Sequence, residues 1–203
     1  SFIGAGNMSK AIISGLVEKG YDPSNIMASN PSSGKLNALS SNLNICTTSD
    51  NQEAIDFADV VMLAVKPQLM QSVCKEFILH KPNTLFVSIA AGLKVNRLQD
   101  FLPAGAKIVR VMPNTPSAVG LGMSGIYADS NISDEQVNTV VQIMKSVGKT
   151  LVVKNEDDIN TVIAAAGSSP AYFFLIAQVM QQAAIEMGLD DKSARLLVEQ
   201  AML

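Results

Sequence analysis

The chain has 203 residues, of which 48% are hydrophobic and 16% charged, and this is enough apolar material for one large core or a domain with a smaller partner. The formal net charge is −3 with both signs interspersed, so no basic face is offered to nucleic acid or to anionic lipid. No continuous apolar run reaches the roughly 18 residues that span a bilayer, and no secretory pattern opens the chain. We therefore expect a globular cytoplasmic protein that binds neither nucleic acid nor membrane.

The chain opens with an apolar stub that runs into a glycine turn and then into a helical pattern. The residues are Ser1-Phe2-Ile3-Gly4-Ala5-Gly6-Asn7-Met8-Ser9. Such a turn lets backbone N–H groups approach a pyrophosphate at the positive end of the new helix. Ser9 replaces the third glycine of the dinucleotide-binding fingerprint, so an ordinary strand-to-helix turn remains the alternative.

Short apolar runs alternate with stretches of helical period along the next 150 residues. Strands are expected at residues 26–28, 43–47, 60–65, 85–89, 108–111 and 150–153. Helices are expected from Met8 to Gly20, around Leu36, Leu39 and Leu43, from Asp50, where Glu53 is expected to reach back to the first turn, and from Ser133 to Gly148. This alternation predicts an α/β fold with a Rossmann-like, doubly wound, mostly parallel sheet.

The strand signal ends near Asn155, and Asp158 to Leu203 reads as helix after helix. We expect residues 1–154 to form an NAD(P)-binding Rossmann-like domain and residues 155–203 an all-helical dimerisation and substrate domain. No flexible linker separates them, so the helices should pack tightly on the first domain. The last stretch, from Lys192, stops without a cap, and we expect further chain beyond Leu203.

Few side chains suit acid–base or metal chemistry. Cys46 and Cys74 are isolated and suit small buried hydrophobes better than a disulfide or a metal pair. His80, in what reads as an exposed turn, is the only histidine. A hydrolase with a histidine base is therefore excluded, and no catalytic metal is expected. No catalytic residue is assigned.

The end of the second expected strand bears on the choice of dinucleotide. The segment Ala28-Ser29-Asn30-Pro31-Ser32-Ser33-Gly34-Lys35 holds no carboxylate, whereas NAD-specific proteins place an acid here on the ribose 2′-hydroxyl. Hydroxyls, an amide and an ammonium accept a 2′-phosphate, so NADP(H) is favoured. A polar turn suited only to solubility has the same composition, so NAD(H) stays open.

Five segments together resemble the pyrroline-5-carboxylate reductase family, over essentially the whole chain. They are Gly4-Ala5-Gly6-Asn7-Met8, Ala64-Val65-Lys66-Pro67-Gln68, Ala90-Ala91-Gly92, Arg110-Val111-Met112-Pro113-Asn114-Thr115-Pro116 and Gly167-Ser168-Ser169-Pro170-Ala171-Tyr172. The resemblance implies hydride transfer from NADPH or NADH to the cyclic imine of pyrroline-5-carboxylate, which gives proline and is the last step of its biosynthesis. The family's Ser-Pro-Gly-Gly-Thr-Thr substrate segment is absent from these 203 residues, and Ser169 stands where many members have glycine. We therefore expect cofactor binding with little or no turnover from this chain alone.

The resemblance also implies site residues. Cofactor contacts are expected at Ile3, Gly4, Ala5, Gly6, Asn7 and Met8 around the pyrophosphate, Asn30 and Ser32 near the adenosine ribose, Asn51, Ala64, Val65, Lys66, Pro67, Ile89, Ala90 and Ala91. Substrate contacts are expected at Asn114, Thr115, Glu156, Ser168 and Ser169, with Glu156 at the ring nitrogen. Each of these positions also has a purely structural interpretation. Lys66 could simply follow the end of a strand and reach solvent, and residues 112–116 could be a rigid turn. Ser168 and Ser169 could cap a helix at Pro170, and Glu156 could be a solvated helix start.

The expected last helices are apolar on more than one side. Tyr172, Phe173, Phe174, Ile176 and Met180 crowd one stretch, which predicts interleaving with a second copy as in the family's dimers and larger rings. Further chain beyond Leu203 could cover the same faces. Two other functions remain open: a β-hydroxyacid dehydrogenase, although no lysine lies between Ile159 and Met187, and a non-enzymatic NADP(H) sensor.

Overall fold

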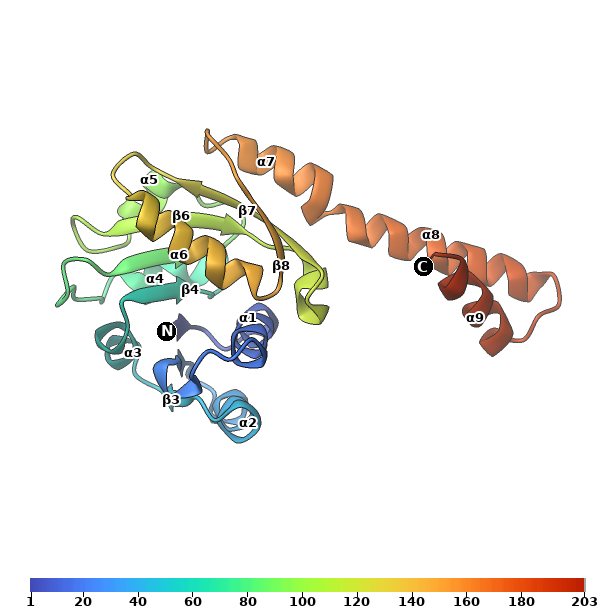
Figure 1. The fold of residues 1–203 in the computed structure, drawn as a ribbon, viewed down its shortest axis with the longest axis horizontal. Helices are drawn as coiled ribbons and strands as arrows, with labels where there is room; N and C mark the ends of the chain where they lie inside the picture. Colours follow the sequence, from blue (N-terminus) through green and yellow to red (C-terminus); the bar gives the residue numbers. More distant parts are fainter. Residues whose placement is uncertain (203) are drawn as a thin grey trace.

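A central mixed sheet organises the first part of the chain in the computed structural model, which describes residues 1–202 (Figure 1). Within these residues eight strands pair in the order β3-β2-β1-β4-β5-β6-β7-β8. The strands are β1 (Phe2–Ile3), β2 (Met27–Ser29), β3 (Cys46–Thr48), β4 (Val60–Leu63), β5 (Leu85–Ser88), β6 (Lys107–Met112), β7 (Gly122–Ala128) and β8 (Gly148–Val152). The first six are parallel; β7 runs antiparallel to β6, and β8 parallel to β7. The strand order reverses between β1 and β4, and parallel sheets place their ligands at such a switch point.

Helices cover both faces of this sheet. They are α1 (Asn7–Glu18), α2 (Ser33–Leu43), α3 (Asn51–Phe57), α4 (Met70–Cys74), α5 (Val95–Gln99) and α6 (Asp134–Lys145), with short 3-10 turns η1 (Pro23–Asn25), η2 (Pro67–Leu69) and η3 (Thr115–Val119). In β4, Met62 packs with α1, α2 and α6, whereas Val61 and Leu63 pack with α3, α4 and α5. A continuous apolar run is what a strand buried on both faces requires. The α/β class and the mostly parallel sheet expected from the sequence are confirmed.

Gly15 lets α1 lie directly on the connection between α6 and β8. A Cβ added at Gly15 would lie 2.7 Å from the Ser146 carbonyl oxygen and 2.8 Å from Cγ1 of Val147. Real Cβ atoms do not approach a carbonyl oxygen so closely, so only glycine fits here without movement of the backbone. This contact fixes the axis of α1 and therefore the direction in which its amino end points.

The start of α3 differs in detail from the sequence-based expectation. Asp50 caps the helix as expected, because its Oδ1 accepts from the Gln52 N–H at 2.8 Å. The Asp50 N–H, however, donates to the Thr48 hydroxyl at 3.0 Å, and that hydroxyl in turn bonds Glu53. Glu53 therefore reaches back over the start of the helix as expected, but it bonds the Thr48 hydroxyl and not the Asp50 N–H, because Thr48 already accepts from that donor.

A helical arm leads away from the sheet domain (Figure 1). It consists of α7 (Asp158–Val162), a π-helical turn η4 (Ile163–Gly167), α8 (Ser169–Glu186) and α9 (Asp191–Ala201), which folds back on α8. The expectation that the helices pack tightly on the first domain is wrong: the structure describes no residue of α8 as buried. Only α7 packs closely on the sheet, where Val162 takes the space that a Cβ on Gly125 of β7 would need. Leu203, the last residue of the expected helical domain, lies outside the described residues.

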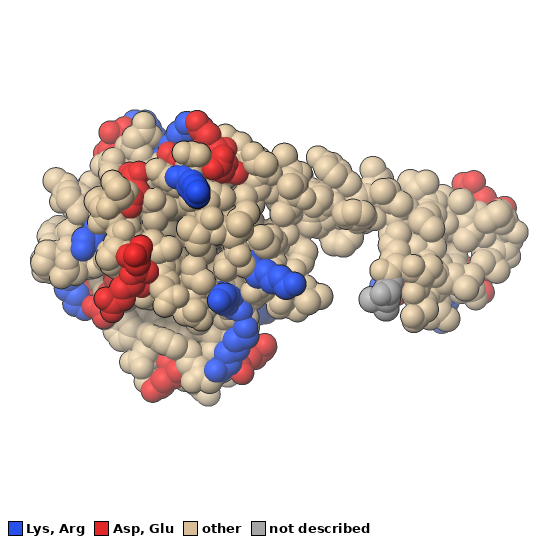
Figure 2. All heavy atoms as spheres, turned by 45° about the horizontal axis from the view of Figure 1, so that its top comes forward, with Lys and Arg blue, Asp and Glu red and all other residues tan. Residues whose placement is uncertain are grey.

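The part of the arm from α7 to the end of α8 is almost free of charge. No Asp, Glu, Lys or Arg lies between Ile159 and Ile185, and Figure 2 shows uncharged atoms along the stretch that joins the sheet domain to the far end of the arm. The helical run Asp158–Glu186 is long and apolar enough to cross a membrane by length and composition. A single helix of this kind is weak support for a membrane span, because apolar interfaces between subunits have the same composition.

Candidate functional site

The glycine turn joins β1 to α1 at the switch point of the sheet. Gly4 has φ +103°, and a Cβ there would lie 2.9 Å from the Ala64 carbonyl oxygen at the end of β4. Its N–H donates to the Ser29 carbonyl at 2.8 Å. Gly6 directly precedes α1, and a Cβ added to it would meet no described atom within 4 Å. The turn is therefore closed against the sheet at Gly4 and open in front of the helix at Gly6, where the first N–H groups of α1 have no acceptor inside the helix.

Ser9 explains how the turn holds its shape without a third glycine. Its hydroxyl is fully buried and donates to the Gly4 carbonyl oxygen at 2.6 Å. This bond occupies a carbonyl that would otherwise be buried without a partner, a loss that costs about 1–3 kcal/mol. The Ser9 hydroxyl is therefore part of the turn. The missing third glycine does not indicate a different kind of turn.

Two asparagines tie neighbouring strand ends to the turn. The Asn30 Oδ1 atom accepts from the Ala5 N–H at 3.2 Å, and its Nδ2 donates to the Ser32 carbonyl at 3.3 Å. Asn51, the first residue of α3, accepts from the Ser29 hydroxyl at 2.5 Å. The structure therefore brings Asn30, Ser32 and Asn51 to one side of the glycine turn, as the expected position beside the adenosine ribose requires.

The ends of β4 and β5 complete this edge. The Ala64 N–H donates to the Ile3 carbonyl at 2.9 Å, and the Ile89 N–H donates to the Leu63 carbonyl at 3.2 Å. The expected contact segments Ala64-Val65-Lys66-Pro67 and Ile89-Ala90-Ala91 therefore follow directly on neighbouring strands. Lys66 is exposed here and precedes η2. After β5, Ala90 is buried and Ala91 is exposed.

The loop after β6 borders the same edge. It holds Pro113, Asn114, Thr115 and Pro116, and the 3-10 turn η3 that begins at Thr115 packs against α1. Thr115 is exposed, whereas Asn114 is 9% exposed and bonds within the chain at both ends of its amide. The two prolines restrict the backbone of this loop before any ligand is present.

Glu156 has a different environment from either expectation. Its Oε1 atom accepts from the Val95 N–H at 2.7 Å and lies 3.3 Å from the Arg110 guanidinium. The side chains of Arg110 and Glu156 are 4% and 17% exposed, so Glu156 is no solvated helix start. It forms a buried ion pair with β6 and caps the amino end of α5. Both contacts use Oε1, so the expected contact of Glu156 with the substrate ring nitrogen stays a prediction that would have to be made through Oε2.

The next acid reinforces this junction at the surface. Asp157 pairs with Lys94 at 2.7 Å, one residue before the start of α5. The hydrogen bond from the Lys94 ammonium holds the pKa of the Asp157 carboxyl below its ordinary value. Both side chains are more than half exposed, so water and salt screen this pair strongly.

Ser168 occupies the N-cap position of α8, which begins at Ser169 and has Pro170 in its first turn. Ser168 has helical backbone angles, and among the described residues its side chain makes no capping hydrogen bond. Its N–H donates instead to the Ile163 carbonyl, five residues back, at 2.9 Å. The expected helix start before Pro170 is confirmed in position, but the expected serine cap is wrong for Ser168, because its side chain makes no bond to the first turn of α8.

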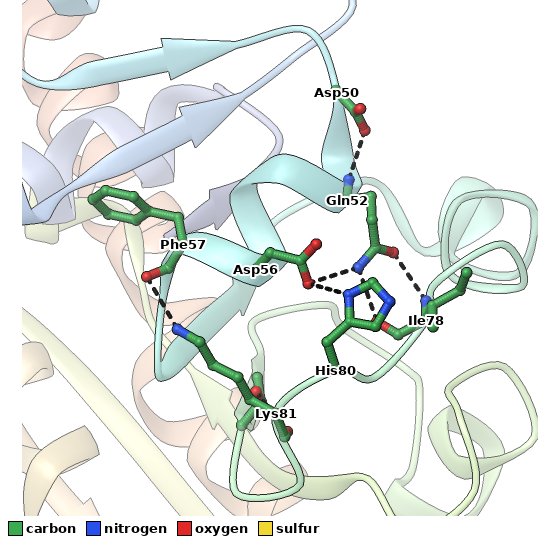
Figure 3. A network of polar contacts seen from close by, with 8 residues as sticks. Asp50, Gln52, Asp56, Phe57, Ile78, His80 and Lys81 are labelled. Atoms are coloured by element: carbon green, nitrogen blue, oxygen red, sulfur yellow. Dashed lines mark hydrogen bonds and ion pairs between the residues drawn. The ribbon is translucent and has the colours of Figure 1, made fainter.

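A network of polar side chains joins α3 to the segment before β5. Figure 3 shows His80 with its Nδ1 atom 2.8 Å from Oδ1 of Asp56, while Gln52 bonds both backbone groups of Ile78. This network fixes the segment before β5 to α3, at the amino end of the strand. Within residues 1–202, no three His, Cys, Asp or Glu side chains gather closely enough to hold a metal ion.

A concavity of about 1000 Å³ lies at the opposite edge of the sheet, lined among others by Phe2, Leu16, Asn25 and Val60. Parallel sheets bind their ligands at the carboxyl ends of the strands, and this hollow is at the amino ends. The two cysteines are free and lie in β3 and α4. Cys74 is buried, which raises the pKa of its thiol to about 12, whereas Cys46 is only half-buried.

A glycine turn at the switch point of a mostly parallel sheet, followed by an apolar helical arm, defines a Rossmann-type NAD(P)-dependent oxidoreductase. Residues 1–92 match the family model described as NADP oxidoreductase coenzyme F420-dependent, and residues 156–203 match pyrroline-5-carboxylate reductase dimerisation. The pyrroline-5-carboxylate reductase of Vibrio alginolyticus is 51% identical over 100% of this chain and 75% of its own length. The chain belongs to the pyrroline-5-carboxylate reductase family.

Solved structures agree with this assignment. A pyrroline-5-carboxylate reductase from Coxiella burnetii superposes with a TM-score of 0.91 at 40% identity, over 99% of this chain and 75% of the other. Pyrroline carboxylate reductase from Plasmodium falciparum with NADP bound gives 0.88 at 29% identity, over 99% and 74%. The resemblance drawn from the five sequence segments is confirmed.

Proposed function

We propose that this chain is the cofactor-binding domain and part of the helical region of an enzyme that reduces 1-pyrroline-5-carboxylate to L-proline. The observation that carries this function is the 51% identity to a reductase of that name along the entire chain. Hydride passes to the cyclic imine, and NADP(H) is the cofactor. The comparisons give no support to a β-hydroxyacid dehydrogenase or a non-enzymatic sensor.

The residues at the carboxyl edge fit a dinucleotide. The open space in front of Gly6 admits a diphosphate to the free N–H groups of α1. At the end of β2, Ser32, Ser33 and Lys35 are exposed, and they offer hydroxyls and an ammonium to a 2′-phosphate. These features support NADP(H) as the cofactor, with NAD(H) as the weaker partner.

The chain has to do little chemistry of its own. When bound, NADPH supplies the hydride, and a protonated cyclic imine is already an electrophile. The residues after β4, β5 and β6 therefore have to hold two rings face to face at about 3–3.5 Å and keep water out. The stiff loop around Asn114 and the small side chains Ala90 and Ala91 suit this orienting role. We propose the cytoplasm as the compartment, and free cysteines fit a reducing environment.

The activity can be tested directly with the full-length protein. We expect oxidation of NADPH, followed by its absorbance, only when pyrroline-5-carboxylate is present, with proline as the product by mass spectrometry. NADH should support a slower reaction. If neither coenzyme is consumed and neither binds by calorimetry, the proposed function is wrong.

We further propose that the arm forms the contact between two copies of the chain. Tyr172, Phe173 and Phe174 of α8 are 61%, 64% and 66% exposed, and Leu196 and Leu197 of α9 are 67% and 59% exposed. Burial of each such side chain contributes about 1.5–3 kcal/mol. The match of residues 156–203 to a dimerisation family favours a second copy over a lipid bilayer as the partner. Larger rings of dimers are also part of this proposal.

A charge placed on the arm should break this assembly. We expect the double substitution Phe173→Glu and Phe174→Glu to turn the full-length protein into a monomer in sedimentation experiments, because four carboxylates cannot be buried at a symmetric contact without partners. Tyr21→Glu is the matched control, since Tyr21 is an aromatic residue 50% exposed on the sheet domain. The control should remain a dimer. A dimeric Phe173→Glu/Phe174→Glu protein would move the interface elsewhere.

A further inference from the structure

The junction between α7 and α8 has an interrupted hydrogen-bond ladder. Pro170 has no N–H, so the carbonyl of Ala166, four residues earlier, lacks its usual α-helical donor. The next N–H along the chain is that of Ala171, and it donates to the Ser168 carbonyl at 3.1 Å. The helical run therefore leaves the Ala166 carbonyl without a backbone donor from either of these two residues.

Asn114 supplies the missing donor from outside the helix. Its Nδ2 atom donates to the Ala166 carbonyl oxygen at 3.0 Å. Its Oδ1 atom accepts from the N–H of Met123, in β7, at 2.8 Å. One side chain, only 9% exposed, therefore joins three segments: the loop after β6, the start of β7 and the π-helical turn.

This junction lies between the two parts of the proposed enzyme. The loop that holds Asn114 continues into η3, which packs beside α1 at the cofactor edge. The helix on the other side of the junction carries the exposed apolar face of the arm. Upstream, α7 is already fixed to β7 at Gly125. The turn from Ile163 to Gly167 is thus the point at which the direction of α8 is set.

We propose that Asn114 is a positioning residue, which sets the angle of α8 against the cofactor edge by replacing the hydrogen bond that Pro170 cannot make. The proposal rests on the proposed function, because its consequence is measured on pyrroline-5-carboxylate reduction. It assigns Asn114 a role through the helix and not through direct substrate contact. Each end of its amide already makes one bond inside the chain, and the residue is only 9% exposed, so little of the side chain is open to a substrate.

Asn114→Asp separates the two bonds in the full-length enzyme. An aspartate keeps an acceptor for the Met123 N–H but places an oxygen against the Ala166 carbonyl, which removes the donor. We expect kcat/KM for pyrroline-5-carboxylate to fall about 30-fold, which corresponds to about 2 kcal/mol, with the Kd for NADPH changed less than threefold. Turnover is measured where sedimentation shows the variant and the wild type to be dimers. Asn131→Asp, the same change at an exposed turn, should leave kcat/KM unchanged.

Pro170→Ala provides the decisive comparison, because it restores an N–H four residues after Ala166. In this background we expect Asn114→Asp to lower kcat/KM less than fivefold. Pro170→Ser restores the same N–H if the alanine variant folds poorly. A loss of equal size in the presence and absence of Pro170 would mean direct substrate contact and would overturn the proposal.

Amide hydrogen exchange gives a second measurement that does not depend on Pro170. Asn114→Asp should speed exchange in peptides that cover residues 163–172 and leave peptides that cover α1 unchanged. Unchanged exchange at 163–172, or unchanged kcat/KM in an active wild-type background, would also overturn the proposal. An inactive wild type would instead refute the proposed function, so the two failures are distinguishable.

Discussion

Gly6→Ala is expected to weaken NADPH binding about 10-fold or more while the protein stays folded. A Cβ at this position meets no described atom of the protein within 4 Å, but it would stand in front of the N–H groups of α1 that we propose as the diphosphate site. An alanine directly before a helix costs about 0.5–1 kcal/mol compared with glycine, so only a small change in the free energy of unfolding is expected. Fluorescence titration with NADPH and urea unfolding of the full-length protein measure the two effects.

Gly4→Ala is the matched comparison and should act in the opposite way. Gly4 has φ +103°, and its added Cβ would lie 2.9 Å from the Ala64 carbonyl oxygen, so the fold itself must move. We expect a loss of about 2–4 kcal/mol in the free energy of unfolding from the left-handed backbone and the steric clash together. If the two alanine variants had the same ratio of binding loss to stability loss, the division of the turn into a structural and a ligand-facing glycine would be wrong.

The sheet could be read from the sequence wherever a strand is buried on both faces. The run Val60-Val61-Met62-Leu63 is apolar throughout because both sides of β4 are covered. The strand β7 was missed because Gly122, Ser124 and Gly125 interrupt its apolar pattern. Those residues are small for packing reasons: a Cβ on Gly125 would lie 2.9 Å from Val162 of α7. The residue type at such positions is set by contacts between elements, and a local sequence pattern does not contain this information.

Some residues of the candidate site could be predicted from the sequence and others could not. Residues at the ends of β1, β4 and β5 follow from topology alone, because parallel strands end at one edge. The environment of Glu156 does not follow from topology, because the segment Asn155-Glu156-Asp157-Asp158 has the composition of a solvated turn. The sequence did hold a signal: Arg110 interrupts the apolar strand Ile108-Val109-Arg110-Val111, and an arginine buried there needs an acidic partner. The position of the arm could not be predicted, because an apolar helix such as α8 needs a surface to cover it, and its own sequence does not say which surface that is.

The buried pair of Arg110 and Glu156 makes Glu156→Ala the most destabilising single change that we expect away from the glycine turn. Its loss leaves an uncompensated guanidinium with 4% of its side chain exposed and removes the acceptor of the Val95 N–H. Breaking a buried ion pair costs about 3–5 kcal/mol in the free energy of unfolding. Urea unfolding of the full-length protein measures it, and Asp157→Ala, which removes the neighbouring exposed acid, should leave the unfolding midpoint nearly unchanged.

A second variant separates the charge from the packing. Arg110→Met combined with Glu156→Ala removes both charges, so no unpaired guanidinium remains buried. We expect the double variant to be about 1–3 kcal/mol more stable than Glu156→Ala alone. Both variants lack the ion pair, but only Glu156→Ala keeps an unpaired guanidinium buried away from water. If the double variant were less stable than Glu156→Ala, or if Glu156→Ala behaved like Asp157→Ala, the carboxylate would not be fixing α7 to the sheet. In that case the direction of the arm would have to depend on the Val162–Gly125 contact and on Asn114 alone.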